Sequence, residues 1–583
     1  MSIENGSILP LRPDESPVIA PGTGRFFYWV MGFGVLLGSV LLSAANLWWG
    51  DLNQDEGWYL YAARLVSQGI LPYRDFAFTQ GPVMPTVYSW VQPWLAQGGV
   101  AAGRGFTAIL GLLAACATAA LVGRLTPAPR RAAATLIAFT LIGLNVYQSY
   151  FFTVVKTYSL TALFLMSGFW LLSVALERRT APAMLLAGAV MALAVATRSS
   201  AVVAPGISAL ILWGPGRRLW PAAGWLFALG AVLMGLLVFL PFFILDPEAF
   251  WFCVVKYHTA RSAGGFFPAL VYKAGFVSRL VQAYFVAFGF CAAALIWLGA
   301  DRWLKGQGGE SGRLASAAKP SPDSRAWPVR FGMDSIRALL CWMLWLSVAG
   351  VTALHASAPF PYDDYQVFVF PLFVAGLTLL LTQRVGERML PWLTLTAVLL
   401  SAASAVSSPI NQDWFIQGRD RIWWRMKDCP PLKKLQTTAA YLRTLAGPDE
   451  LLLTQDPYLA VESGLVLPRG LEMGQFSYFP GLTDAQARHL HVFNRRGLER
   501  LLNTCPASVA ALSGYAFAMR SPEVEPVPPA DEAAFRAQVD RRYARVRQVP
   551  YFGQAATTLE IYQRRPQTNP SHHVNVDTKE KTP

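Results

Sequence analysis

The chain has 583 residues, of which 54% are hydrophobic and 14% are charged, and its formal net charge is +14. Soluble domains carry about 25% charged residues, so this composition excludes a protein that lies mostly in water, including zinc-finger arrays, coiled coils and disordered scaffolds. The positive charge does not indicate nucleic acid, because Lys and Arg of membrane proteins gather in cytoplasmic loops and attract anionic lipid headgroups. We expect a polytopic membrane protein whose partners include membrane lipids and no nucleic acid.

Apolar stretches of spanning length recur between residues 27 and 408. Single transmembrane helices are predicted at about 27–48, 106–123, 132–150, 157–176, 220–245, 276–299, 334–354, 366–382 and 389–408. A further apolar region, about 181–213, is interrupted around Arg198, and we interpret it as two short helices that meet there on one face of the bilayer. The sequence therefore predicts a polytopic α-helical membrane protein with about 11 transmembrane helices.

Lys and Arg in the loops between these helices set the predicted orientation. If the N-terminus is cytoplasmic, the inner loops carry 17 Lys and Arg and the outer loops carry 9, in keeping with the positive-inside tendency. Residues 1–26 then form a cytoplasmic tail and 27–408 the transmembrane domain. Within that domain, about 50–105 is the first outer loop and about 301–333 a flexible cytoplasmic linker.

The first outer loop is long enough to carry structure of its own. Residues Glu56 to Gln68 place apolar side chains at helical spacing and are followed by Gly69, a usual helix stop. This pattern predicts an amphipathic helix that lies flat in the membrane interface. A second amphipathic helix is expected from Val83 to Leu95.

The chain becomes polar after the last predicted span. Residues 409–565 are expected to form a soluble α/β domain outside the membrane, with strands at Glu450–Thr454 and Val509–Ser513 and a helix at Ala485–Leu502. Residues 566–583 are expected to be disordered. Cys429 and Cys505 belong to this domain, where they either form a disulfide or remain free thiols.

The positions of the acids favour an enzyme over an ion-coupled transporter. Fourteen carboxylates lie between Phe27 and Ser408; eight of them fall in predicted outer loops and none falls in the middle of a span. Proton and ion pathways usually need ionisable side chains inside the membrane. Chemistry at the outer surface is therefore the simpler interpretation.

Three short motifs follow one another in the first outer loop: Asn53-Gln54-Asp55-Glu56, Leu71-Pro72-Tyr73-Arg74-Asp75-Phe76 and Gln80-Gly81-Pro82. This order resembles the first loop of the polytopic GT-C glycosyltransferases, notably bacterial relatives of the protein O-mannosyltransferases and of the lipid A aminoarabinose transferases (glycosyltransferase family 39). In that family an acidic pair precedes a juxtamembrane helix and a Gly-x-x-Pro-Tyr-x-Asp-Phe stretch, here Gly69 to Phe76. The resemblance covers roughly residues 25–410.

The resemblance implies transfer of a sugar from a polyprenyl-phosphate donor to a lipid, glycan or protein acceptor, at the outer face of a bacterial inner membrane. The alternatives are a non-catalytic transporter or flippase of lipid-linked sugars and an envelope assembly component. The chain departs from the family at three places. Gln80 stands where many relatives have Lys, the loop around Lys156 lacks an acid, and Asp363-Asp364-Tyr365 replaces a His-Tyr-x-x-Pro motif.

Such a transfer needs a carboxylate that accepts the proton of the acceptor hydroxyl and cationic groups that hold the leaving phosphate. Asp55 is the candidate base, and Glu56 is expected to place it or to help in binding. The alternative is that the two acids only cap the interfacial helix, since acids favour a helix N-terminus.

Five side chains of the outer loops are candidates for holding the phosphate: Lys156, Arg198, Lys256, His258 and Arg261. Arg198 is the strongest, because an arginine between two short helices is costly unless it faces water or an anion. Lys256 and Arg261 are also explained as anchors at the lipid headgroups, and a single histidine is more often an ordinary polar residue.

Further substrate contacts are expected from Arg74, Asp75 and Gln80 in the first loop and from Asp364 and Tyr365 between two late spans. An acidic turn between apolar helices is an alternative explanation for Asp364. No cofactor is expected. A divalent metal ion is compatible with these acids, but no spacing of the residues indicates one.

Overall fold

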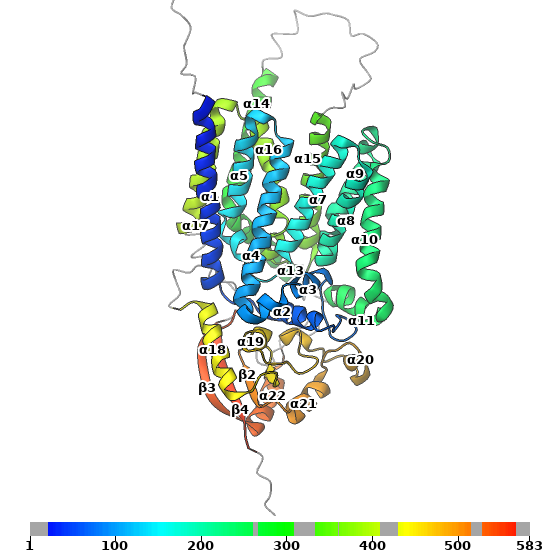
Figure 1. Cartoon of the computed structure of the whole chain (residues 1–583), viewed down its shortest axis with the longest axis vertical. Helices are drawn as coiled ribbons and strands as arrows, with labels where there is room; N and C mark the ends of the chain where they lie inside the picture. Colours follow the sequence, from blue (N-terminus) through cyan, green and yellow to red (C-terminus); the bar gives the residue numbers. More distant parts are fainter. Residues whose placement is uncertain are drawn as a thin grey trace, which may run out of the picture.

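The computed structural model of the chain describes residues 21–259, 266–307, 333–359, 361–407, 429–514, 527–554 and 556–566. A bundle of long helices stands on a smaller part, which we call the outer domain (residues 429–566), and short helices of the first loop lie between the two (Figure 1). Most of the predicted N-terminal tail, of the linker and of the C-terminal tail lies outside the described residues.

The bundle helices follow the apolar stretches of the sequence. They are α1 (Pro21–Trp49), α4 (Gln92–Leu125), α5 (Arg131–Gly143), α7 (Tyr158–Arg178), α8 (Ala181–Thr197), α9 (Val203–Trp213), α10 (Ala223–Leu245), α14 (Phe285–Gln307), α15 (Met333–Ser357), α16 (Phe370–Arg384) and α17 (Leu390–Ser407). Within the described residues, six helices are long and apolar enough to span a membrane, or seven if a bent pair is one span. The protein is therefore a multi-pass membrane protein, and the total of 11 spans stays a prediction.

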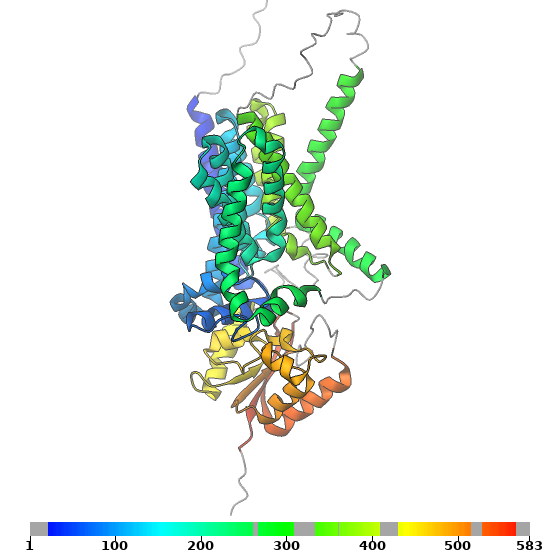
Figure 2. The same cartoon turned by 90° about the vertical axis from the view of Figure 1, so that its right-hand side faces the viewer.

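Two predicted spans are interrupted, so their predicted extents were wrong. The 276–299 stretch is divided between α13 (Phe266–Ala283) and α14, which are bent by 90°, and α14 leans away from the bundle (Figure 2). The 132–150 stretch ends at Gly143 and restarts as the short α6 (Val146–Phe151). Asn145 connects the two breaks, because its side chain accepts from the Gln148 amide at 2.8 Å and donates to the Ala283 carbonyl at 2.9 Å.

The first loop begins with the predicted interfacial helix, which is α2 (Gln54–Ser67). It starts with a capping box between Asn53 and Glu56 and is followed by Gly69, whose φ of +80° is the left-handed conformation that glycine adopts without strain. The second predicted helix is shorter than expected: α3 (Val83–Ser89) stops, and α4 begins at Gln92 with a kink at Gly99.

The outer domain contains a four-stranded sheet in the order β1-β2-β4-β3. The strands are β1 (Leu452–Thr454), β2 (Val509–Leu512), β3 (Tyr543–Phe552) and β4 (Thr557–Arg564); β1 and β2 are parallel, and the other pairings are antiparallel. Strands therefore occur at both predicted places. The predicted helix at 485–502 is instead two helices, because His491 has a positive φ of 55° and Asn494 caps a new helix.

Helices surround this sheet and connect it to the bundle. They are α18 (Pro431–Leu445), α19 (Pro457–Ser463), α20 (Asp484–His489), α21 (Arg495–Thr504) and α22 (Pro529–Arg542). A single cluster of buried apolar residues includes side chains of α2 and of the outer domain. The contact is close at Gly57, where an added Cβ would lie 2.2 Å from the Tyr458 nitrogen. One turn further along α2, the Leu467 amide donates to the Tyr61 hydroxyl at 3.0 Å. The two parts are thus packed as one body.

Candidate active site

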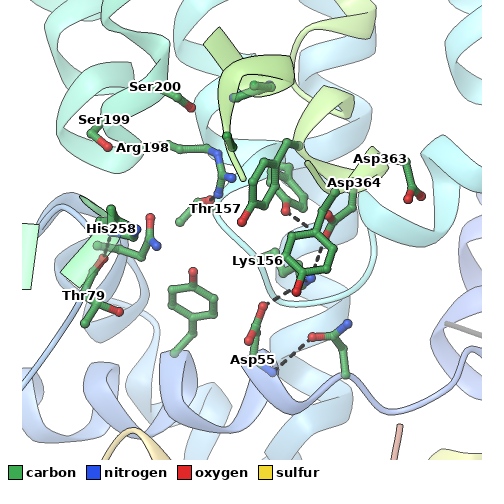
Figure 3. A pocket seen from close by; sticks show the side chains of 18 of the residues that line it. Asp55, Thr79, Lys156, Thr157, Arg198, Ser199, Ser200, His258, Asp363 and Asp364 are labelled. Carbon is green, nitrogen blue, oxygen red and sulfur yellow. Dashed lines mark hydrogen bonds and ion pairs between the residues drawn. The ribbon is translucent and has the colours of Figure 1, made fainter. Parts of the chain in front are cut away.

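A cavity of about 900 Å³ opens between the first loop, the ends of the bundle helices nearest the outer domain, and the outer domain itself (Figure 3). Of the twelve site residues predicted from the sequence, seven line it: Asp55, Gln80, Lys156, Arg198, His258, Asp364 and Tyr365. Segments that are far apart in the sequence thus meet here, as the bundle requires.

Asp55 reaches the cavity from the first turn of α2. The Asn53 side chain accepts from its amide at 3.1 Å, so the backbone of this turn is fixed by local capping. The carboxylate accepts from Trp58 Nε1 at 3.3 Å and lies 3.2 Å from Lys156 Nζ, and its side chain keeps 26% of its exposure. Asp55 is therefore held at two points and still faces the cavity.

Lys156 joins two acids from different parts of the chain. Its Nζ lies 2.7 Å from Asp364 Oδ2 and 3.2 Å from Asp55 Oδ2 (Figure 3). Asp364 also accepts from the Tyr158 hydroxyl at 2.9 Å. Burial alone would raise the pKa of the Asp364 carboxyl, but the charge and hydrogen bond of Lys156 outweigh it and hold that pKa below its usual value. Asp364 is therefore an ionised partner for Lys156.

Arg198 has a different environment. It lies between α8 and α9, and its Nη1 donates to Thr157 Oγ1 at 3.2 Å. Its guanidinium carbon lies 4.8 Å from the centre of the Tyr158 ring and 4.7 Å from that of the Tyr365 ring, which is cation–π distance. Among the described residues no carboxylate forms an ion pair with Arg198, and its Nε atom is buried without a hydrogen-bond partner. Its positive charge is therefore available to an anion in the cavity.

Glu56 does not line the cavity. Its carboxylate accepts from Arg104 Nε at 2.7 Å and from Arg104 Nη2 at 2.6 Å, and both side chains are fully buried. Arg104 also donates to the backbone oxygens of Leu47, Gly50 and Asp51. This pair thus attaches the start of α2 to α4 and to the end of α1, which fits the expectation that Glu56 places Asp55 and not the expectation of direct binding.

Four other predicted residues lie away from the cavity or outside the described chain. Arg74 and Asp75 pair with each other at 2.7 Å on the surface, and Asp75 also accepts from the Leu71 amide at 2.8 Å, so both belong to a turn. Lys256 is exposed and is not among the lining residues. Arg261 lies outside the described residues.

The first-loop motif also shapes the cavity through Tyr73. This buried tyrosine has a positive φ of 70°, and its hydroxyl donates to the backbone oxygen of Gln80 at 2.6 Å. On the same side of the cavity, His258 Nε2 lies 2.7 Å from the backbone oxygen of Thr79 (Figure 3). Gln80 and His258 therefore belong to the wall that Tyr73 and Thr79 hold in place.

Arg279, Tyr147 and His355 also line the cavity, and they were not among the residues predicted from the sequence. Arg279 Nε lies 2.8 Å from Asp363 Oδ1, and Asp363 Oδ2 accepts from the Tyr147 hydroxyl at 2.6 Å. His355 contacts Gln366 through Nδ1 at 3.0 Å. The available signal was charge at the end of an apolar stretch, but Arg279 and His355 both resembled ordinary helix-end residues.

Among the described residues, no group of three or more His, Cys, Asp and Glu side chains is placed so that it could hold a metal ion. The acids of the cavity are instead paired with Lys156 and Arg279. All six cysteines are free thiols, Cys429 and Cys505 included.

Comparison with solved structures confirms, at the level of the fold, the predicted resemblance to the GT-C membrane glycosyltransferases. No protein-family model and no curated protein sequence matches the chain. The crystal structure of ArnT, a lipid A aminoarabinose transferase, from Cupriavidus metallidurans bound to undecaprenyl phosphate matches with a TM-score of 0.55 and 12% identity, over 93% of this chain and 98% of that chain.

The same enzyme in the apo state matches with a TM-score of 0.54 and 14% identity, over 92% of this chain and 98% of that chain. The Archaeoglobus fulgidus oligosaccharyltransferase complex with zinc and sulfate has a TM-score of 0.45 and 13% identity, over 88% of this chain and 72% of that chain. At these identities the similarity to ArnT establishes a shared fold.

Proposed function

We propose that the protein transfers a sugar from a polyprenyl-phosphate carrier to an acceptor hydroxyl at the outer face of the membrane. The observation that carries this proposal is the charge pattern of the cavity. The cavity is lined by three cations, Lys156, Arg198 and Arg279, and by three carboxylates, Asp55, Asp363 and Asp364, so these charges balance. Lys156 pairs with Asp364 and Asp55, and Arg279 pairs with Asp363, while no carboxylate forms an ion pair with Arg198 among the described residues. A cation without a directly paired acid suits a phosphodiester, which carries one negative charge, better than it suits a neutral glycan.

The proposed chemistry uses few groups. The acceptor oxygen attacks the anomeric carbon, the bond from that carbon to the phosphate oxygen breaks, and Asp55 takes the hydroxyl proton. The leaving phosphate gains negative charge as the bond breaks, and Arg198 stabilises that charge. Cation–π contacts with Tyr158 and Tyr365 hold the Arg198 guanidinium in position. Lys156 holds the Asp55 carboxylate in place. No step is routed through a metal ion, so activity is expected to survive chelation with EDTA.

The fold supports this assignment as well. A structure of ArnT with undecaprenyl phosphate bound shows that this fold accommodates a polyprenyl phosphate. In the present chain, the cavity is bordered by the interfacial helix α2 and by bundle helices, so a lipid carrier can present its headgroup while its chain stays in the membrane. Bacterial inner-membrane location, with the outer domain on the far side from the cytoplasm, follows as part of the same proposal. The identities of the sugar and acceptor are separate questions.

The test uses purified protein with radiolabelled polyprenyl-phosphate sugars and membrane extract as the acceptor source. Asp55→Asn keeps the size of the side chain but cannot accept a proton, so transfer is expected to fall about a hundred- to ten-thousandfold while donor binding persists. Arg198→Ala is expected to weaken donor binding and turnover together, because the phosphate is charged before the bond breaks.

Glu248→Gln is the matched control, because Glu248 is an acid of an outer loop with 67% of its side chain exposed. It is expected to transfer at the rate of the unmodified protein. Normal transfer by folded Asp55→Asn protein would refute the role of Asp55. Movement of labelled lipid between leaflets without transfer in any variant would favour a flippase.

A further inference from the structure

The outer domain contributes directly to the cavity. Phe476 and Gln554, both from this domain, are among the lining residues, and Gln554 is 6% exposed. Gln554 lies in the turn between β3 and β4, after Gly553, which has a φ of +74°. The tip of this hairpin therefore meets the start of α2, although the two segments are 500 residues apart.

The contact is a hydrogen bond to the helix that carries Asp55. The first amide groups of a helix have no partner inside the helix and must find one elsewhere. At α2, the Asp55 amide is taken by the Asn53 side chain at 3.1 Å, while the Gln54 amide donates to Gln554 Oε1 at 3.2 Å. Gln554 thus completes the capping of the turn in which Asp55 lies.

The turn that carries Gln554 is attached to the rest of the outer domain. Lys434 Nζ of α18 donates to the backbone oxygens of Pro550 and Tyr551 at 3.2 and 3.1 Å. At Gly553, an added Cβ would lie 2.8 Å from the Tyr458 hydroxyl, and Tyr458 is itself buried. The position of Gln554 is therefore set by the packing of the outer domain.

We infer that Gln554 is a positioning residue for Asp55, so that the outer domain forms part of the catalytic site. This inference rests on the proposed function, in which Asp55 accepts a proton. Misplacement of a reacting group by about 1 Å can cost on the order of a hundredfold in rate. Fixing the Gln54 amide restricts the neighbouring Asp55 carboxylate to the geometry in which Trp58 and Lys156 also hold it.

The test compares three variants. Gln554→Met has a side chain of similar length and no acceptor, whereas Gln554→Glu keeps an acceptor oxygen. Tyr61→Phe is the matched control, because it removes another hydrogen bond between α2 and the outer domain, the one from the Leu467 amide, in a part of α2 away from Asp55. Hydrogen–deuterium exchange of the amides at residues 54–56 and sugar transfer are measured on the full chain.

Gln554→Met is expected to speed exchange at these amides and to lower kcat about tenfold or more with little change in KM for the donor. Gln554→Glu should restore most of both properties, and Tyr61→Phe should leave both unchanged. Unchanged exchange in Gln554→Met would refute the claim that Gln554 fixes the first turn of α2. Faster exchange with a normal kcat, or equal losses in Tyr61→Phe, would overturn the positioning role. Normal transfer by Asp55→Asn would instead refute the proposed function, while the exchange result would still report on whether Gln554 fixes that turn.

Discussion

Replacing Glu56 by Gln is expected to destabilise the protein without acting on the chemistry itself. Glu56 and Arg104 are both fully buried, and the carboxylate receives two hydrogen bonds from the guanidinium. Glutamine has the same size, but it removes the negative charge and directs an NH₂ group at the N–H groups of Arg104. A buried cation is then left without its counter-charge.

The expected cost follows from this burial. Breaking a buried ion pair by removing one partner typically costs about 3–5 kcal/mol, which is a large part of the roughly 5–15 kcal/mol by which proteins are stable. The chain offers a matched control on the same helix, because Arg124 of α4 forms an ion pair with Glu177 that is partly exposed to solvent. Glu177→Gln is expected to cost less than about 1 kcal/mol.

The assay is the thermal inactivation midpoint of purified protein, together with transfer per folded molecule at low temperature. Glu56→Gln should lower the midpoint by several degrees and Glu177→Gln should hardly change it. Combining Glu56→Gln with Arg104→Met removes the stranded charge and should recover part of the loss. An unchanged midpoint would refute this reasoning, because the stranded charge of Arg104 should lower the stability whatever the effect on transfer.

Three further predictions concern the outer domain. Burial raises the pKa of the Glu472 carboxyl from 4.5 to about 7, so the folded state keeps a proton that the unfolded state releases, and stability falls as the pH rises from 4.5 to 7. This loss is on the order of 3 kcal/mol, and Glu472→Gln should abolish it when unfolding is measured at pH 5 and pH 8. Gly57→Ala should loosen the outer domain, because the new Cβ would lie 2.2 Å from the Tyr458 nitrogen; faster proteolysis between the bundle and the outer domain measures this, and unchanged cleavage would contradict it. Thiol labelling of denatured, unreduced protein should modify both Cys429 and Cys505, since both are free thiols, whereas protection of the two would indicate a disulfide.

Most of the helices and strands were predictable from local sequence patterns. The interfacial helix α2 was predictable because its cap, its apolar spacing and Gly69 all lie within a few residues of one another. The breaks at residues 144–145 and 284 were not, because Asn145 stabilises them by bonding to Ala283, 138 residues away. Hydropathy reports the length of an apolar stretch, and it does not report such a contact.

The candidate site was also only partly predictable from the sequence. Asp55 was predicted from the acidic motif before the interfacial helix and from its resemblance to the GT-C first loop. Lys156 and Arg198 were predicted from their charge in outer loops beside apolar helices, and all three line the cavity. The burial of Glu56 was not predictable, since it depends on an ion pair with Arg104, which is distant in the sequence. Gln554 carried no signal, because a glutamine in a hairpin turn is ordinary until the turn is seen to meet α2.

The 500-residue separation between Gln54 and Gln554 also sets an order of events during biosynthesis. At about 5–20 residues per second, roughly 25 to 100 seconds pass between synthesis of the interfacial helix and synthesis of its hairpin partner. During that interval Asp55 already exists on a helix whose first turn is incompletely held. If Gln554 positions Asp55 as we infer, the helices can insert one after another before the site is complete, and a chain released before the hairpin is made would be in the membrane but inactive.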